Sequence, residues 1–116
     1  YSPKESLNWA RKNGGKINLF YNAREAVKNS DVVITDKWIS LHESNKNKKL
    51  KELKKFQVNS KLMLSAKKNA IFLHCLPASI GREVTKEVLY GKQSRVYSQA
   101  ENRISSVKSV IEYCFK

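Results

Sequence analysis

Two short apolar runs stand out from an otherwise polar chain. Residues 31–36 read DVVITD and residues 70–75 read AIFLHC, so each run is almost continuously apolar and then ends on polar or reactive side chains. A continuous apolar run of this length is typical of a parallel strand that is buried on both faces. Two weaker runs, KINLFY at 16–21 and SRVYS at 94–98, are also β-prone. The pattern therefore predicts four strands.

Segments with helical spacing separate these runs. Predicted helices cover residues 5–13, 23–30, 60–68, 86–90 and 100–115, and a basic stretch at 44–56 repeats apolar residues at helical spacing. Asn22, Asn59 and Thr85 are placed to cap three of them. Strands that alternate with helices predict an α/β fold: a Rossmann-like, three-layer parallel sheet with helices on both faces.

The residues that follow the strands are the first candidates for a site. In open parallel sheets, ligands bind at the carboxyl ends of the strands. These ends are Thr35–Asp36 after residues 31–34, residues 74–77 after residues 70–73, and residues 99–103 after residues 94–97. We therefore expect polar and reactive side chains from three separate parts of the chain to meet at one edge.

Asp36 has two interpretations. A single acidic residue after a strand most often caps the turn that follows it, here DKWIS. A carboxylate at the edge of a sheet can also hold a substrate ammonium group through a charge-assisted hydrogen bond.

His74 and Cys75 also have a structural alternative, because a free Cys is most often a small buried apolar residue. However, Leu76 and Pro77 follow directly, so the strand must stop there. Cys75 is therefore expected at a strand-to-loop transition. A neighbouring positive charge there would favour its thiolate. Adjacent residues of a strand point to opposite faces. A catalytic dyad of His74 and Cys75 is therefore not predicted.

Arg103 lies near the start of the last predicted helix. As a surface residue its charge would oppose the helix dipole. Beside the amides of a helix N-terminus, the same cation suits an anionic or carbonyl ligand.

Composition bounds the class of protein. A chain of 116 residues forms at most one domain, and no run approaches the ~20 apolar residues of a membrane span. The net charge of +13 would suit nucleic acid, but it is carried mainly by Lys interspersed with Asn, which favours a solvated surface. Cys75 and Cys114 are widely separated, so neither a disulfide framework nor a zinc site is predicted, and a cytoplasmic location is the default.

Four segments together carry a resemblance to a known family. DVVITDKWIS, FQVNSKLM, AIFLHCLPA and GREVTKEVLYGKQSRVYSQAENR follow one another in the order and spacing of the C-terminal half of ornithine carbamoyltransferases. The segments HCLP and AENR are specific within the aspartate/ornithine carbamoyltransferase superfamily, and the Cys points to the ornithine branch. The resemblance covers essentially the whole chain.

The resemblance implies transfer of the carbamoyl group of carbamoyl phosphate to L-ornithine, giving citrulline and phosphate, with no cofactor or metal. Asp36, with Ser40 and the backbone of Leu41, would bind the amino-acid end of ornithine. Cys75 would lie against the attacking amine. His74, the Leu76 carbonyl and Arg103 would orient and polarise the carbamoyl group. The implied catalysis is positioning plus stabilisation of an oxyanion, without covalent chemistry.

Two departures from the family pattern qualify the resemblance. The family's usual Ser-Met-Gly loop reads Ser40-Leu41-His42 here, which leaves open another amine substrate such as putrescine. The Ser-Thr-Arg-Thr-Arg and His-Pro-x-Gln motifs of the family's carbamoyl-phosphate domain do not occur. We therefore expect residues 1–116 to be an incomplete ornithine-binding domain, inactive alone, from a parent that is a homotrimer. The alternatives are a catalytically dead interaction fragment and a basic nucleic-acid-binding module.

Overall fold

The computed structural model describes residues 4–39 and 46–116 of the chain. In chain order the elements are α1 (Lys4–Lys12), α2 (Ala23–Ala26), β1 (Val32–Thr35), α3 (Lys46–Leu53), the 3₁₀ helix η1 (Lys54–Phe56), α4 (Ser60–Met63), β2 (Ile71–His74), α5 (Lys86–Leu89) and α6 (Val96–Cys114).

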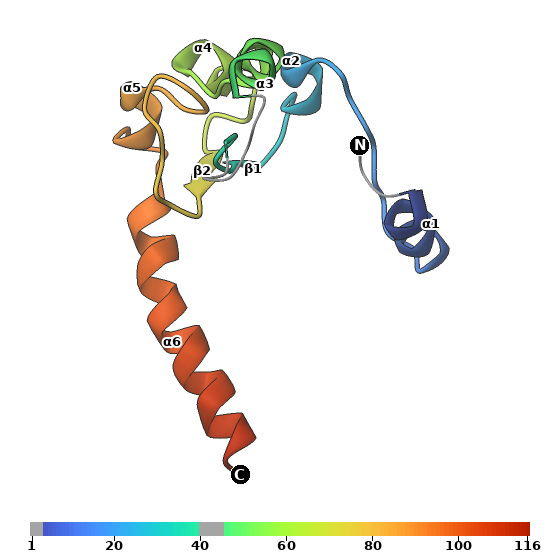
Figure 1. The fold of residues 1–116 in the computed structure, drawn as a ribbon, viewed down its shortest axis with the longest axis vertical. Helices are drawn as coiled ribbons and strands as arrows, with labels where there is room; N and C mark the ends of the chain where they lie inside the picture. Colours follow the sequence, from blue (N-terminus) through green and yellow to red (C-terminus); the bar gives the residue numbers. More distant parts are fainter. Residues whose placement is uncertain (1–3, 40–45) are drawn as a thin grey trace.

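The sheet consists of β1 and β2, which run parallel and lie side by side in Figure 1. Their register pairs Val32 with Ile71 at one end and Thr35 with His74 at the other. The connection between them contains α3, η1 and α4, so it is a helical crossover of the kind that parallel strands require. The predicted α/β fold with a parallel sheet is confirmed, as a small and incomplete fragment of that architecture.

The core lies on one face of this sheet. Val33 of β1 and Phe72 of β2 are register partners, and both are buried. The remaining buried cluster is Val58, Met63, Val84, Val88, Leu89 and Val96. On the other face of β1, Val32 and Ile34 are 46% and 64% exposed, so the expectation that this strand is buried on both faces is wrong. Within the described residues, β1 has a covered face and an open one.

Two predicted strands do not form. Residues 16–21 contain no strand, and their apolar side chains Ile17, Leu19 and Phe20 are exposed. Among the described residues the sheet consists of β1 and β2, so this segment does not pair with either strand. At 94–98, the Phe72 N–H donates to the Gln93 carbonyl (2.8 Å) and the Arg95 N–H donates to the Phe72 carbonyl (2.9 Å). That single bridge is followed at once by α6, which therefore begins four residues before the predicted start at position 100.

Capping explains where the short helices begin. The Asn22 side chain accepts a hydrogen bond from the Arg24 N–H (2.9 Å), and that of Asn59 accepts one from the Leu62 N–H (2.9 Å). Thr85 precedes α5 as predicted but its side chain makes no capping hydrogen bond. Both α2 and α4 end after four residues, well short of the predicted 23–30 and 60–68.

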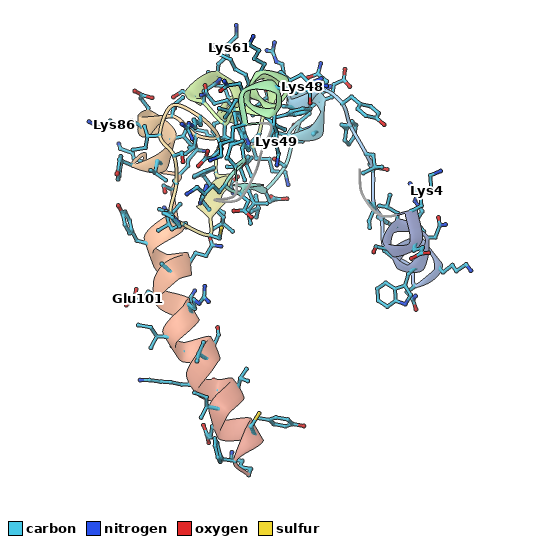
Figure 2. All side chains as sticks on the ribbon, in the orientation of Figure 1. Lys4, Lys48, Lys49, Lys61, Lys86 and Glu101 are labelled. Atoms are coloured by element: carbon cyan, nitrogen blue, oxygen red, sulfur yellow. The ribbon has the colours of Figure 1, made fainter. Side chains whose placement is uncertain are left out.

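Two helices extend from the compact part of the molecule. Figure 1 shows α6 projecting as one long rod and α1 lying apart from the sheet, joined to it by an extended segment. No helix in the described part of the chain is both long and apolar enough to cross a membrane. Lysines gather over the crossover helices, where Figure 2 labels Lys48, Lys49 and Lys61.

Candidate functional site

The carboxyl ends of β1 and β2 bring Asp36 and Cys75 together. Because Thr35 and His74 are register partners, the next residue of each strand lies beside the other. The Cys75 thiol donates a hydrogen bond to Asp36 Oδ1 (Sγ to Oδ1, 2.8 Å), and the Lys37 backbone N–H donates to the same oxygen (2.6 Å). Both side chains are exposed, so this pair faces solvent at the predicted ligand edge.

The pair is a carboxylate beside a protonated thiol. The hydrogen bond from Cys75, followed by that from the Lys37 N–H, lowers the pKa of Asp36 below its ordinary value. The same hydrogen bond, with partial desolvation and the charge of Asp36, raises the pKa of Cys75; the charge of Arg103 opposes this rise. The effect of Arg103 is in the direction that favours a thiolate, but the Asp36 anion has the larger effect on the pKa of Cys75.

Removing the charge of Asp36 should make Cys75 more reactive. In a Cys114→Ser background, Asp36→Asn should lower the pKa of the Cys75 thiol and accelerate alkylation at pH 8. The acceleration should be about threefold per pKa unit, since a larger thiolate fraction is partly offset by lower nucleophilicity. Iodoacetamide labelling across pH measures this. Asp31→Asn is the control, because Asp31 pairs instead with Lys67 (2.7 Å) at the far end of β1.

His74 is buried at the end of β2. Its side chain is 0% exposed, so its ring does not open onto the solvent-facing edge where Asp36 and Cys75 lie. Nδ1 instead accepts a hydrogen bond from the Leu76 N–H (2.8 Å), and Nε2 lies 3.6 Å from Glu83 Oε1. His74 and Cys75 lie on opposite sides of the strand end, as the alternation of a strand requires.

Leu76 adopts an unusual backbone conformation directly after the strand. Its φ is 54°, in the left-handed region that side chains with a Cβ rarely occupy, and a cis peptide bond joins it to Pro77. Left-handed backbone in a residue other than Gly is concentrated at functional sites. The hydrogen bond from the Leu76 N–H to the buried His74 ring helps to hold this conformation.

The first turns of α6 supply the third part of the edge. Gln99 Oε1 accepts a hydrogen bond from the His74 backbone N–H (3.1 Å), which ties α6 to the end of β2. Arg103 was predicted near the start of the last helix. Because α6 begins early, Arg103 instead lies seven residues after Val96, the first residue of the helix. It is exposed, and its charge acts on Cys75. Ser40 and Leu41 lie outside the described residues.

An open pocket of about 280 Å³ occupies this edge. Ile34, Thr35, Asp36 and Cys75 line it, which combines an apolar wall with one carboxylate and one thiol. This lining suits a small ligand that carries an ammonium group and an alkyl chain. Within the described residues, no group of three or more His, Cys, Asp or Glu side chains could hold a metal ion.

Glu83 is a site residue that the sequence did not reveal. It is buried, and it contacts His74 and the backbone of Ser79. In the sequence, Arg82 and Glu83 are adjacent residues of opposite charge, and they resemble an ordinary surface pair at the start of a helical segment. The contact depends on how the loop folds back, and no local pattern encodes it.

The fold and the edge define the class of protein: a Rossmann-like α/β fragment whose strand ends bring together a carboxylate, a neutral thiol and a cation from α6. The family profile described as "Aspartate/ornithine carbamoyltransferase, Asp/Orn binding domain" matches residues 1–114. The chain therefore belongs to the aspartate/ornithine carbamoyltransferase family.

Known relatives agree with this membership. An ornithine carbamoyltransferase of Agrobacterium fabrum is 47% identical over 108 residues, covering 93% of this chain and 35% of the relative. One of Methanococcus maripaludis is 47% identical over 116 residues, covering 97% and 38%. The chain thus spans little more than a third of the length of these relatives.

Solved structures match the fold as well. The ornithine carbamoyltransferase of Pyrococcus furiosus superposes with a TM-score of 0.85 at 38% identity, covering 96% of this chain and 37% of that one. The anabolic enzyme of Campylobacter jejuni gives 0.84 at 41% identity, covering 93% and 36%.

Proposed function

We propose that residues 1–116 are the ornithine-binding segment of an ornithine carbamoyltransferase. In the longer protein the reaction would transfer the carbamoyl group of carbamoyl phosphate to the side-chain amine of L-ornithine, giving citrulline and phosphate. The observation that carries this proposal is the Asp36–Cys75 pair at the carboxyl edge of the sheet, joined by a 2.8 Å hydrogen bond and open to solvent.

Each group at the edge has a role that follows from its chemistry. The Asp36 carboxylate binds the α-ammonium group of ornithine, with Ser40 and the Leu41 backbone completing that end. The neutral Cys75 thiol lies beside the attacking amine and positions it without forming a bond to the substrate. The Leu76 carbonyl and Arg103 orient and polarise the carbamoyl group together with His74, whose ring accepts a hydrogen bond from the Leu76 N–H. The Arg103 cation stabilises the oxyanion that forms as the amine attacks.

The phosphate of carbamoyl phosphate requires groups from elsewhere. Among the described residues, Arg103 is the one cation whose charge acts on Cys75. The Ser-Thr-Arg-Thr-Arg motif of the family that the sequence resembles does not occur in the 116 residues. We propose that another domain of a homotrimeric cytoplasmic parent supplies the phosphate site, so that residues 1–116 alone do not turn over. The reaction needs no metal or organic cofactor.

The sequence Ser40-Leu41-His42, which differs from the family's usual Ser-Met-Gly, makes another amine a second candidate substrate. Putrescine lacks only the α-carboxylate of ornithine and keeps an ammonium group at the other end of its alkyl chain, so it could also bind to the Asp36 carboxylate. The Asp36 carboxylate and the Ile34 wall suit either amine; we favour ornithine because the relatives at 47% identity are named ornithine carbamoyltransferases.

A chimaera tests the proposal. In it, residues 1–116 replace the matched segment of the Methanococcus maripaludis ornithine carbamoyltransferase, which they cover at 47% identity. We expect citrulline from ornithine and carbamoyl phosphate, little product from putrescine, and none from the isolated chain. A folded chimaera that makes no carbamoylated product would instead support a catalytically dead interaction fragment.

A further inference from the structure

Glu83 and His74 form a buried pair beneath the ligand edge. They are the two buried polar or charged side chains of the described residues, at 1% and 0% exposure. Burying a carboxylate is costly unless it is hydrogen-bonded or paired. Glu83 is therefore expected to make contacts that an apolar side chain could not replace.

These contacts all lead to the loop that follows β2. Glu83 Oε1 accepts a hydrogen bond from the Ser79 backbone N–H and lies 3.6 Å from His74 Nε2. On the other side of the ring, Nδ1 accepts a hydrogen bond from the Leu76 N–H (2.8 Å). Because Nδ1 is an acceptor, the ring hydrogen lies on Nε2, where it faces the Glu83 carboxylate. One carboxylate oxygen thus accepts a hydrogen bond from the Ser79 N–H and faces the His74 ring at a distance longer than a hydrogen bond.

Glu83 itself is firmly anchored. Its carbonyl accepts a hydrogen bond from the Val58 N–H (2.9 Å), and the next residue, Val84, is fully buried in the core. The Gln57 side-chain amide donates to the carbonyls of Gly81 and Arg82, at 2.8 Å each. The carboxylate is therefore held by the core and can act as a fixed support.

We propose that Glu83 is a positioning residue: through His74 and Ser79 it fixes the backbone of residues 75–79, and so sets the Cys75 thiol against Asp36 and holds Leu76 at the ligand edge. Its contribution to carbamoyl transfer rests on the proposed function. Its effect on the Cys75 thiol does not, because that effect needs only the isolated chain.

Alkylation of Cys75 tests this support in a Cys114→Ser background. Glu83→Met fills the space but removes the acceptor, so the loop loosens, the Cys75–Asp36 hydrogen bond weakens and the thiol becomes more acidic. We expect labelling at pH 8 to accelerate about threefold or more. Glu83→Gln keeps an acceptor oxygen for Ser79 and His74, so it should retain the original pH profile.

Val84→Ala is the matched control, because it creates a cavity in the core beside Glu83 and leaves the Glu83 carboxylate in place. It should lower the thermal midpoint and leave the Cys75 profile unchanged. The proposal is overturned if folded Glu83→Met labels like the parent chain, if Glu83→Gln does not restore the profile, or if Val84→Ala shifts it equally.

If Glu83→Met does not fold, amide hydrogen exchange on the unaltered chain tests whether the backbone of residues 75–79 is held in place. We expect the Leu76 and Ser79 amides to exchange on the order of tenfold more slowly than those of residues 16–21, although they lie in a loop. Equal rates would contradict the proposal.

In the chimaera, Glu83→Met should lower kcat/KM and Glu83→Gln should not. A chimaera that is inactive with the unaltered segment would refute the proposed function alone.

Discussion

Asp36→Asn in the chimaera is expected to raise KM for ornithine about 10- to 150-fold with little change in kcat. The physical reason is the loss of a charge-assisted hydrogen bond to the α-ammonium group, which is worth about 1.5–3 kcal/mol. That contact is present in both the bound substrate and the transition state, so its loss appears in KM. Initial rates of citrulline formation over a range of ornithine concentrations measure the effect.

Asp31→Asn provides the matched control for this prediction. Asp31 precedes the same strand, carries the same side chain and pairs with Lys67 at the end of β1 away from the pocket. Its replacement should leave both kinetic constants unchanged. An Asp36→Asn chimaera with the parent KM would remove Asp36 from the amino-acid site.

Cys75→Ala is expected to reduce kcat/KM about 100-fold without abolishing turnover. A protonated thiol that positions the amine contributes by alignment, and a misplacement of about 1 Å costs on the order of 100-fold. A covalent nucleophile would instead cost on the order of a millionfold. Cys114→Ala is the control, since Cys114 lies at the end of α6, the helix that projects from the body of the molecule.

Complete loss of turnover in a folded Cys75→Ala chimaera would contradict the positioning role. A rate equal to that of the parent would also contradict it, because the thiol would then have no part in the reaction. Folding itself should be unaffected, since Cys75 is exposed and lies outside the buried cluster.

The apolar pattern predicted the two strands that pair along their whole length, but it failed for residues 16–21 and for residues 94–98, which make only a single bridge to β2. Residues 31–36 and 70–75 pair with each other, so both predictions are confirmed. Residues 16–21 have equal β propensity but no neighbouring strand among the described residues, and they remain outside the sheet. Propensity describes a fit to a pleated surface, and a strand forms only where another strand offers that surface.

The site was predictable where it depended on topology. The rule for strand ends placed Asp36 and Cys75 at one edge, and the structure joins them by a hydrogen bond. The same rule could not show that Glu83 lies 3.6 Å from the buried His74 ring, because Glu83 returns to the strand end from nine residues further along the chain. The early start of α6 moved Arg103 away from the helix terminus for a similar reason: the bridge of Ser94 to Phe72 ends the extended segment.

Protection of Cys75 from alkylation tests the central claim most directly, that ornithine binds at the Asp36–Cys75 edge. In a chimaera whose only reactive thiol is Cys75, saturating ornithine with an unreactive carbamoyl-phosphate analogue should slow labelling at least about tenfold, because the ligand would cover the thiol. Asp36→Asn should shift this protection to higher ornithine concentrations. Citrulline formation by a chimaera in which ornithine leaves the labelling of Cys75 unchanged would place the amino-acid site elsewhere and contradict the account.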